Sequence, residues 1–430
     1  MNCCPQELLS CLDEADSRMV ALIDTLTDEQ LHVPYERGIN PPIWEMGHSA
    51  FFFEYFLLRE LYGGEVRMPG YDEIWDSFEI PHRERWSQGV VPPKTESFDY
   101  YRRVIDETRS KLDRESELTG KEAYLTKYCI AHQCMHLESL IWSRQTLGYP
   151  APPFSELAPD GLETTIDSGD AEIPGGDYFI GIPAHDQNAP DATFSFDNER
   201  PGFTKRLEPF QISKTLVSNQ EFAEFVDDGG YENPDHWSFG GKYWLRESAA
   251  KHPIYWQKRD GEWWMRRFDQ LEPLRLKAPA LHLSFREAEA FCKWSGRRLP
   301  TEFEWEAAAR GPGAFLYPWG NQIVDHAAWD LDAKYLGTAP VTAFPQGASP
   351  SGCLQMLGTA WEWTTSQYLP FDGFKVDMYP YMSTLQFGDH KTTRGGGCAT
   401  SSCIIRNTYR QAYFPDRNDV FIGFRTCAQD

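Results

Sequence analysis

Two histidines four residues apart constrain the fold and the chemistry of this chain more than any other feature of its sequence. His132 and His136 lie within residues 121–146, which contain no glycine or proline and are predicted to form one long helix. Side chains spaced by four project from one helix face, one turn apart, so both imidazoles can bind the same metal ion. The alternative is a helix that carries two histidines in its core or on its surface without any ligand.

A catalytic metal needs a third protein ligand and open positions for substrate. His48 is the best candidate, although a single histidine among residues as apolar as 50–58 is usually a core residue and gains weight only from the pair. We predict that Glu138 orients a ligand imidazole or joins a polar network rather than binding metal. Cys134 lies between the paired histidines and is interpreted as a core residue.

Residues 1–150 predict an all-helical bundle in which the ligands come from facing helices. A loop rich in Pro, Arg and Trp is expected over residues 65–95. The expected helices cover residues 5–26, a short capped turn from Thr27, residues 48–61, a helix opening at Ser97, and residues 121–146.

The character of the sequence changes after Gly148. Residues 151–171 are predicted to be a linker, and residues 172–430 an irregular α+β domain with many turns. Helical periodicity in this second domain is confined to residues 219–228, 284–295 and 302–310.

The charge balance excludes some classes of partner. The chain of 430 residues has a formal net charge of −23, whereas nucleic acid and anionic membranes attract basic surfaces. The N-terminal residues lack a basic and then apolar leader, and no apolar run is long enough to span a bilayer. We therefore expect a cytoplasmic protein whose 10 cysteines are reduced.

The second domain carries a series of unusual strings in a fixed order. Trp beside Gly lets irregular backbone pack around rings, and buried Arg–Glu pairs can replace regular strand pairing. The strings begin at Ile173 (Ile-Pro-Gly-Gly), Phe196 (Phe-Asp-Asn-Glu-Arg-Pro), Gly229 (Gly-Gly-Tyr), Arg297 (Arg-Arg-Leu-Pro-Thr-Glu-Phe-Glu-Trp-Glu), Trp319 (Trp-Gly-Asn), Trp361 (Trp-Glu-Trp-Thr), Arg394 (Arg-Gly-Gly-Gly) and Gly423 (Gly-Phe-Arg). Together they resemble the formylglycine-generating-enzyme (sulfatase-modifying-factor) domain, which has a C-type-lectin-like fold.

The N-terminal bundle is similar to the DinB-like bundle, and the two domains in this order resemble the ergothioneine-biosynthesis sulfoxide synthases with their ovothiol- and selenoneine-pathway relatives. The resemblance implies a mononuclear non-haem Fe(2+) held by His48, His132 and His136. It also implies O2-dependent bonding of a thiol sulfur to the imidazole of hercynine, the trimethylated histidine, with sulfoxide formation. Three neutral imidazoles leave the ion its charge and open positions for substrates, in a site expected at the interface of the two domains.

Several positions depart from the pattern of this family. Met135 stands where a Gln often contacts the imidazole substrate, and Gln411-Ala412-Tyr413 replaces Asn-Trp-Asp. The carboxylate that reads the amino group of γ-glutamylcysteine is thus missing, although Arg417 stands where that branch has a substrate-binding Arg. Cysteine, γ-glutamylcysteine and a selenosugar therefore all stay open as donors, with γ-glutamylcysteine expected to be poor.

Two further pairs of residues are candidates for the site. Arg83 and Arg85 could hold a substrate carboxylate, with a surface ion pair as the alternative. Tyr379 and Tyr381 could act as general acids, with aromatic packing as the alternative.

A non-enzymatic reading also exists, in which the second domain binds a ligand and the bundle merely holds a metal; three intact histidines argue against it. The formylglycine-generating reaction itself is not expected, because Cys398 and Cys403 do not clearly match the copper-binding cysteine pair of those enzymes.

Overall fold

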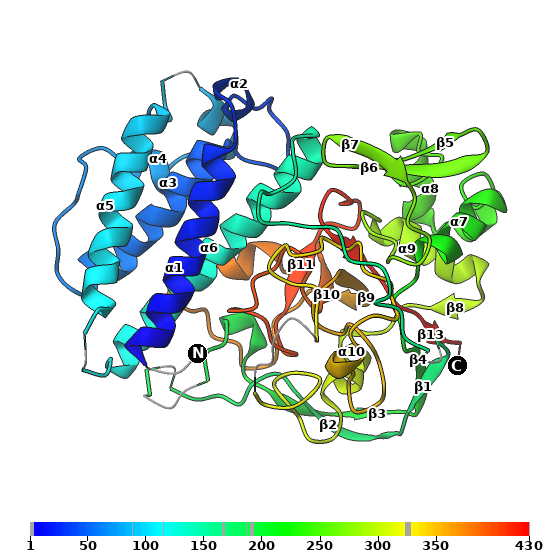
Figure 1. The fold of residues 1–430 in the computed structure, drawn as a ribbon. Coiled ribbons are helices and arrows are strands. Elements are labelled where there is room, and N and C mark those ends of the chain that lie inside the picture. Colours follow the sequence, from blue (N-terminus) through cyan, green and yellow to red (C-terminus); the bar gives the residue numbers. More distant parts are fainter. Residues whose placement is uncertain are drawn as a thin grey trace. The chain divides into compact units, whose positions relative to one another are not determined.

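The chain forms two compact units, which are described separately. The first comprises Met1–Phe154 with His185–Phe194, and the second Ser155–Ala184 with Ser195–Asp430. The predicted fold class, a helical region followed by a mixed α and β region, is confirmed (Figure 1). The computed structural model describes residues 4–429 except residues 88, 115, 166–167, 187, 190–192 and 323–327, and it does not describe the side chain of Tyr381.

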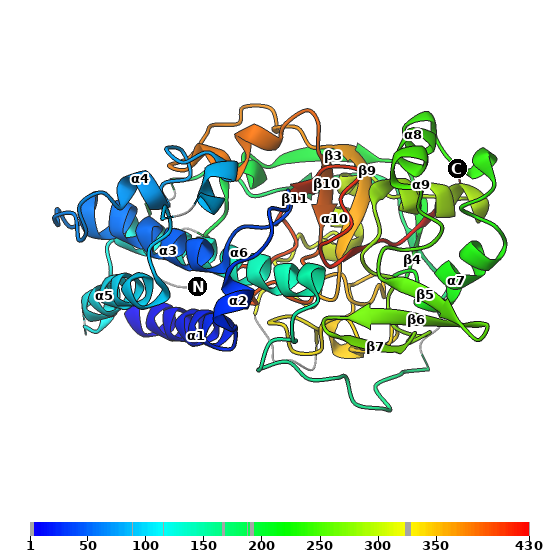
Figure 2. The same ribbon diagram turned by 90° about the horizontal axis from the view of Figure 1, so that it is seen from above.

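The first unit is a bundle of long helices. Helix α3 packs on α5 and α6, and α1 packs on the same two helices (Figures 1 and 2). Apolar residues recur every three or four positions in α1, so one face is buried in the bundle. The helices of this unit are α1 (Pro5–Asp24), α2 (Asp28–Leu31), α3 (Pro42–Phe52), α4 (Asp72–Trp75), α5 (Lys94–Leu112) and α6 (Gly120–Leu147).

Helix α6 matches the prediction to within one residue at either end. Its start is fixed by a capping box, in which the Thr119 hydroxyl accepts the backbone N–H of Glu122 and the Glu122 carboxylate accepts that of Thr119. Gly148 ends the helix with a φ of 68°, a left-handed conformation that favours glycine. Buried residues occur on every side of α6.

The helix that carries His48 begins earlier than predicted. It starts at Pro42, whose missing N–H costs nothing in a first turn, and it continues after Phe52 as a wide π-helical segment, Phe53–Arg59. His48 therefore lies in the middle of α3 and not at its start. The expected loop over residues 65–95 contains α4 and a 3-10 turn, His82–Trp86.

The second unit is built from small sheets joined by irregular segments (Figure 1). The strand orders are β1-β4-β13-β8, β11-β10-β9-β12, β2-β3 and β5-β6-β7. Their bounds are β1 (Asp170–Ile173), β2 (Gly176–Ile180), β3 (Phe203–Leu207), β4 (Phe210–Ser213), β5 (Trp256–Arg259), β6 (Glu262–Arg267), β7 (Gln270–Pro273), β8 (Arg297–Arg298), β9 (Trp361–Gln367), β10 (Lys391–Arg394), β11 (Gln411–Tyr413), β12 (Ile422–Gly423) and β13 (Cys427–Ala428).

Three helices of this unit lie where periodicity placed them: α7 (Asn219–Asp227), α9 (Phe285–Trp294) and α10 (Glu302–Arg310). Helix α8 (Phe239–Ser248) was not predicted. Its first turn contains two glycines, which weaken the helical signal, but the Ser238 hydroxyl caps it by accepting the backbone N–H of Gly241.

Several of the strings that carried the resemblance contribute residues to the interior of this unit. Arg425 and Glu362 are both fully buried and make a bidentate ion pair, with Nε–Oε2 at 2.7 Å and NH2–Oε1 at 2.9 Å. Gly423 beside them lets the backbone approach closely, since a Cβ there would lie 2.6 Å from the carbonyl oxygen of Ala280. The ion pair thus joins two distant strings whose strands, β9 and β12, are also paired with each other.

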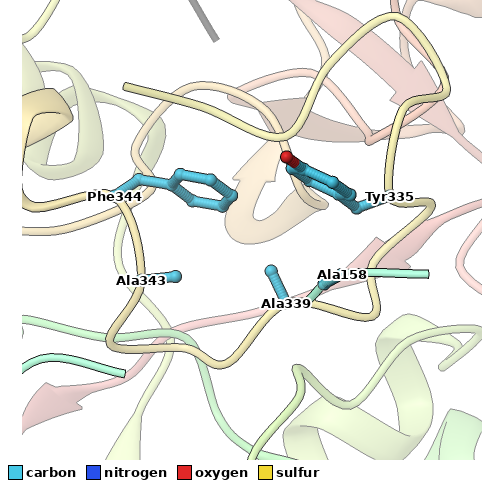
Figure 3. Close-up of a cluster of buried hydrophobic side chains, with 5 residues drawn as sticks. All are labelled: Ala158, Tyr335, Ala339, Ala343 and Phe344. Carbon is cyan, nitrogen blue, oxygen red and sulfur yellow. The ribbon is translucent and has the colours of Figure 1, made fainter. Parts of the chain in front are cut away.

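A smaller apolar cluster anchors the start of the second unit. Tyr335 and Phe344 are stacked with ring centroids 6.1 Å apart, and three alanines fill the space beside them (Figure 3). Ala158, from the segment predicted to be a linker, belongs to this cluster. That segment therefore packs as part of the second unit. Within the part of the chain that the structure describes, none of the helices is both long and apolar enough to cross a membrane.

Candidate metal centre

Three histidines of the first unit converge on one point. His48 comes from α3, and His132 and His136 come from successive turns of α6. One ring nitrogen of each lies within 4.8 Å of the others, and the Nε2 atoms of His132 and His136 are 3.2 Å apart. The helix spacing alone brings the α6 pair together, whereas His48 is delivered by the packing of α3 on α6.

The outer nitrogens of two rings are held by the protein. Nδ1 of His48 donates a hydrogen bond to the carbonyl oxygen of Trp75 at 2.5 Å, and Nδ1 of His136 donates to the carboxylate of Glu45. A proton on Nδ1 leaves Nε2 as the lone-pair donor, which is how proteins select the tautomer of a metal ligand. Both Nε2 atoms are therefore available to a metal ion.

Aromatic rings fix the imidazole planes. The ring of Trp44 is stacked on His48, with centroids 4.6 Å apart and an interplanar angle of 12°. Phe52 is stacked on His132, with centroids 3.8 Å apart and an angle of 15°. Because these rings restrict rotation of the imidazoles, the ligand geometry is set before any ion binds.

Burial disfavours the protonated form of two of the three histidines. It lowers the pKa of His48 to about 3, with a further contribution from the neighbouring His136, and it lowers the pKa of His132 well below its usual range. Neutral imidazole is the form that binds metal. Three nitrogen donors at this spacing fit one divalent transition-metal ion, and imidazole donors suit iron, zinc, copper or nickel.

Glu45 is the carboxylate of this site, and sequence reasoning missed it. Its Oε1 accepts hydrogen bonds from Asn40 at 2.9 Å and from Ser139 at 2.7 Å, while Oε2 accepts the one from His136. Burial alone would raise the pKa of Glu45, but the charge and hydrogen bond of His136 with these other donors hold it at about 2. Glu45 lies on α3 and contacts a histidine of α6, so no local spacing in the sequence identifies it. Glu138, the residue predicted for this role, is buried in α6.

The other predicted residues of the first unit lie as follows. Met135, which lies between His132 and His136 in the sequence of α6, is half-buried. The guanidinium of Arg85 lies 3.7 Å from the centroid of the Trp44 ring and donates to Oδ1 of Asn40 at 2.8 Å. Arg83 is exposed and lies over the ring of Tyr35, at 5.2 Å.

In the second unit the structure brings Tyr413 and Arg417 together. Arg417 lies over the Tyr413 ring at 5.3 Å and forms an ion pair with Asp419. Tyr413 is buried in β11, with its ring edge-on to those of Trp361 and Trp363. The side-chain oxygen of Gln411, two residues earlier, accepts the N–H of Ala412.

Tyr379 is buried immediately before a 3-10 turn, Pro380–Met382; the side chain of Tyr381 lies outside the described part of the chain. The carboxylate of Asp197 holds this segment, because its Oδ2 accepts the backbone N–H of Asp377 at 3.2 Å and the hydroxyl of Ser383 at 3.0 Å.

Known families and proteins match both parts of the chain. Residues 12–140 match the DinB superfamily model, and residues 163–430 match that of the sulfatase-modifying factor enzyme 1-like domain. The chain is 32% identical to a hercynine oxygenase of Mycolicibacterium smegmatis, over 96% of either chain, and 31% identical to one of Mycobacterium tuberculosis, over 98% of either chain. It is also 32% identical to a formylglycine-generating enzyme of Thermomonospora curvata, over 65% of this chain and 99% of that one.

Proposed function

This chain belongs to the hercynine oxygenase family, and we propose that it is an iron(II)-dependent enzyme of ergothioneine biosynthesis that joins a thiol sulfur to the imidazole ring of hercynine. The observation that carries the proposal is the convergence of three imidazole nitrogens within 4.8 Å, in a chain similar to hercynine oxygenases along nearly its whole length. Three imidazoles are the donor set of a catalytic metal centre that leaves positions open for substrate, and the Glu45 carboxylate beside them orients His136.

The proposed reaction balances with O2 as the only oxidant. A ring C–H bond of hercynine and the S–H bond of the donor break, and a C–S bond forms. One oxygen atom becomes the sulfoxide oxygen, and the other leaves as water with both hydrogens. O2 accepts four electrons in all: two are lost as the C–S bond forms, and two as sulfur becomes a sulfoxide.

His48, His132 and His136 would hold the iron, which would supply a site of one-electron and O2 chemistry. The residues of the chain then have separate tasks. Glu45 keeps the proton of His136 on Nδ1, and the carbonyl of Trp75 does the same for His48. These contacts keep the Nε2 lone pairs aimed inward, so the open side of the centre is available to substrate.

We propose roles in substrate recognition for residues that the sequence singled out. Met135 lies between the α6 ligands and would pack against the substrate imidazole. Arg417 and Tyr413 would receive the carboxylate and the cationic end of a substrate, since a guanidinium pairs with carboxylates and an aromatic face attracts quaternary ammonium groups. Tyr379 or Tyr381 would donate a proton as general acid.

The donor is proposed to be a small thiol, cysteine, and not γ-glutamylcysteine. Tyr413 stands where a carboxylate would meet the amino group of the γ-glutamyl moiety. A buried ammonium left without a partner costs about 1–3 kcal/mol, or roughly tenfold to a hundredfold in specificity. A selenosugar is the second candidate. We place the reaction in the cytoplasm, where thiol donors stay reduced.

The test is anaerobic loading of the full-length protein with Fe(II), followed by hercynine, one donor and O2, with products read by mass spectrometry. Parallel reactions use cysteine, γ-glutamylcysteine and a selenosugar, and a second series replaces hercynine with histidine. We expect a hercynine–cysteine sulfoxide that needs both iron and O2. Absence of a coupled product with every donor would contradict the proposal, and γ-glutamylcysteine as the best donor would contradict the specificity assigned to Tyr413.

A further inference from the structure

The side chain of Arg85 reaches from a 3-10 turn toward the residues that support the histidines. Its guanidinium lies 3.7 Å from the centroid of the Trp44 ring, and one of its nitrogens donates to Oδ1 of Asn40 at 2.8 Å. Arg83, two residues earlier in the same turn, is exposed and lies over Tyr35 instead. The two arginines that looked equivalent in sequence therefore have different surroundings.

Ring stacking connects Arg85 to His48 through Trp44. The ring of Trp44 that contacts Arg85 is also stacked on His48. Nε1 of Trp44 donates to the carbonyl of Ile74 at 2.9 Å, next to the Trp75 carbonyl that holds His48. A shift of Trp44 would therefore move the plane against which the His48 imidazole rests.

Hydrogen bonds connect Arg85 to His136 through Asn40 and Glu45. Asn40 accepts from Arg85 with its side-chain oxygen and donates to Oε1 of Glu45 with its side-chain nitrogen at 2.9 Å. Glu45 in turn holds Nδ1 of His136. The hydrogen bond from Arg85 thus fixes which way the Asn40 amide points, because a flipped amide would present its oxygen to the carboxylate.

We propose that Arg85 is a positioning residue for the metal centre, which holds His48 through Trp44 and His136 through Asn40 and Glu45. The inference rests on the proposed metal centre and assigns Arg85 to the ligands instead of to a substrate carboxylate. Arginine suits both connections, since its planar, always charged group can stack on a ring and donate in its own plane at the same time. Lysine can donate but cannot stack in this way.

The experiment measures metal binding without any substrate. Co(II) is titrated into metal-free full-length protein against a chelator, and the absorption spectrum of the bound ion is recorded. The variants are Arg85→Gln, Arg85→Lys and Asn40→Ala. The matched control is Arg102→Gln in α5, which removes an exposed arginine lying 5.4 Å from the Phe98 ring.

We expect Arg85→Gln to weaken Co(II) binding about tenfold and to shift the absorption spectrum of the bound ion. Tenfold is the lower end of the loss in metal affinity seen when residues that hydrogen-bond to metal ligands are changed. Arg85→Lys should also weaken binding, because it loses the stacking contact, and Arg102→Gln should match the wild type. The double variant Asn40→Ala/Arg85→Gln should lose less Co(II) affinity than the product of the two single-variant losses, since both substitutions act through Glu45.

Wild-type Co(II) affinity and spectrum in Arg85→Gln and Arg85→Lys would overturn the proposal. A raised KM for hercynine or donor in those variants would then identify Arg85 as a substrate residue. Melting curves check that each variant folds, and Arg85→Lys, which keeps the charge, decides the question if Arg85→Gln does not fold. Since Co(II) binding needs no substrate, failure of the proposed reaction would show itself separately.

Discussion

The carboxylate of Glu45 in α3 accepts a hydrogen bond from Nδ1 of His136 in α6, a residue 91 positions later in the chain. This contact joins the two ligand-bearing helices at the point where their histidines meet. It also fixes the tautomer of His136, so that Nε2 faces the other ligands.

Glu45→Gln should weaken metal binding about tenfold to a hundredfold, because an amide is a poorer acceptor for the imidazole proton than a carboxylate. The check is Fe(II) or Co(II) affinity in the metal-free protein, with Glu138→Gln as the comparison. The structure predicts the larger loss for Glu45→Gln. A larger loss for Glu138→Gln would return the role to the residue that the sequence suggested.

Sequence reasoning named the three histidines that the structure brings together, but not the residues that support them. The spacing of His132 and His136 is local and survives in any helix, so it could be predicted from the residues alone. His48 was chosen only through the pair and the family resemblance. Glu45 and Trp44 could not be assigned, because their contacts depend on how α3 packs against its neighbours, which no local pattern encodes.

The helices, too, were predicted well only where a local sequence signal marks them. Helix α6 was predicted to within one residue because residues 121–146 contain no glycine or proline, and the structure adds that a capping box and Gly148 mark its ends. The predicted start of helix α3 was six residues too late, since an apolar helix that opens with Pro41-Pro42 has no polar N-cap residue to mark its start. Helix α8 was missed because glycines in its first turn hide the period, although Ser238 supplies its cap.

Tyr379→Phe tests the proposed general acid. Loss of the hydroxyl should lower kcat about a hundredfold, the lower end for acid–base catalysis, with a smaller change in KM for hercynine. The measurement is steady-state product formation under saturating O2. Tyr243→Phe, an exposed tyrosine on α8, serves as the control. An unchanged kcat in Tyr379→Phe would leave that residue a packing role only.

Glu362→Gln should destabilise the second unit by about 3–5 kcal/mol, because it leaves the buried charge of Arg425 without its partner. Chemical denaturation followed by tryptophan fluorescence measures this. Asp227→Asn provides the contrast, since Asp227 pairs with Lys258 at an exposed site and should cost less than about 1 kcal/mol. If Glu362→Gln lowered the free energy of unfolding by as little as Asp227→Asn, the structural role assigned to the Arg425–Glu362 ion pair would be contradicted.

Asp330 should make stability depend on pH. Burial raises its pKa to about 7, although backbone N–H groups of Gly337 and Tyr335 donate to the carboxylate and oppose the shift. A raised pKa means that the folded state prefers the protonated acid, so this contribution to stability is full below the ordinary pKa and is lost as pH rises through about 7.

The free energy of unfolding of the wild type, compared with that of Asp330→Asn, should therefore fall between about pH 4 and about pH 7. Denaturant titrations of both proteins at several pH values give this difference, and subtraction removes titrations that the two share. A difference that is constant, or that rises with pH, would show that Asp330 is already ionised in the folded protein at low pH.

The central claim is that His48, His132 and His136 hold one catalytic iron. The most direct test is iron content per chain after anaerobic loading with Fe(II) and removal of unbound metal, in the wild type and in each single His→Ala variant. We predict one iron per chain in the wild type, and loss of most of that iron and of hercynine turnover in every variant. A His132→Ala protein that keeps one iron per chain and turns over hercynine normally would contradict the account.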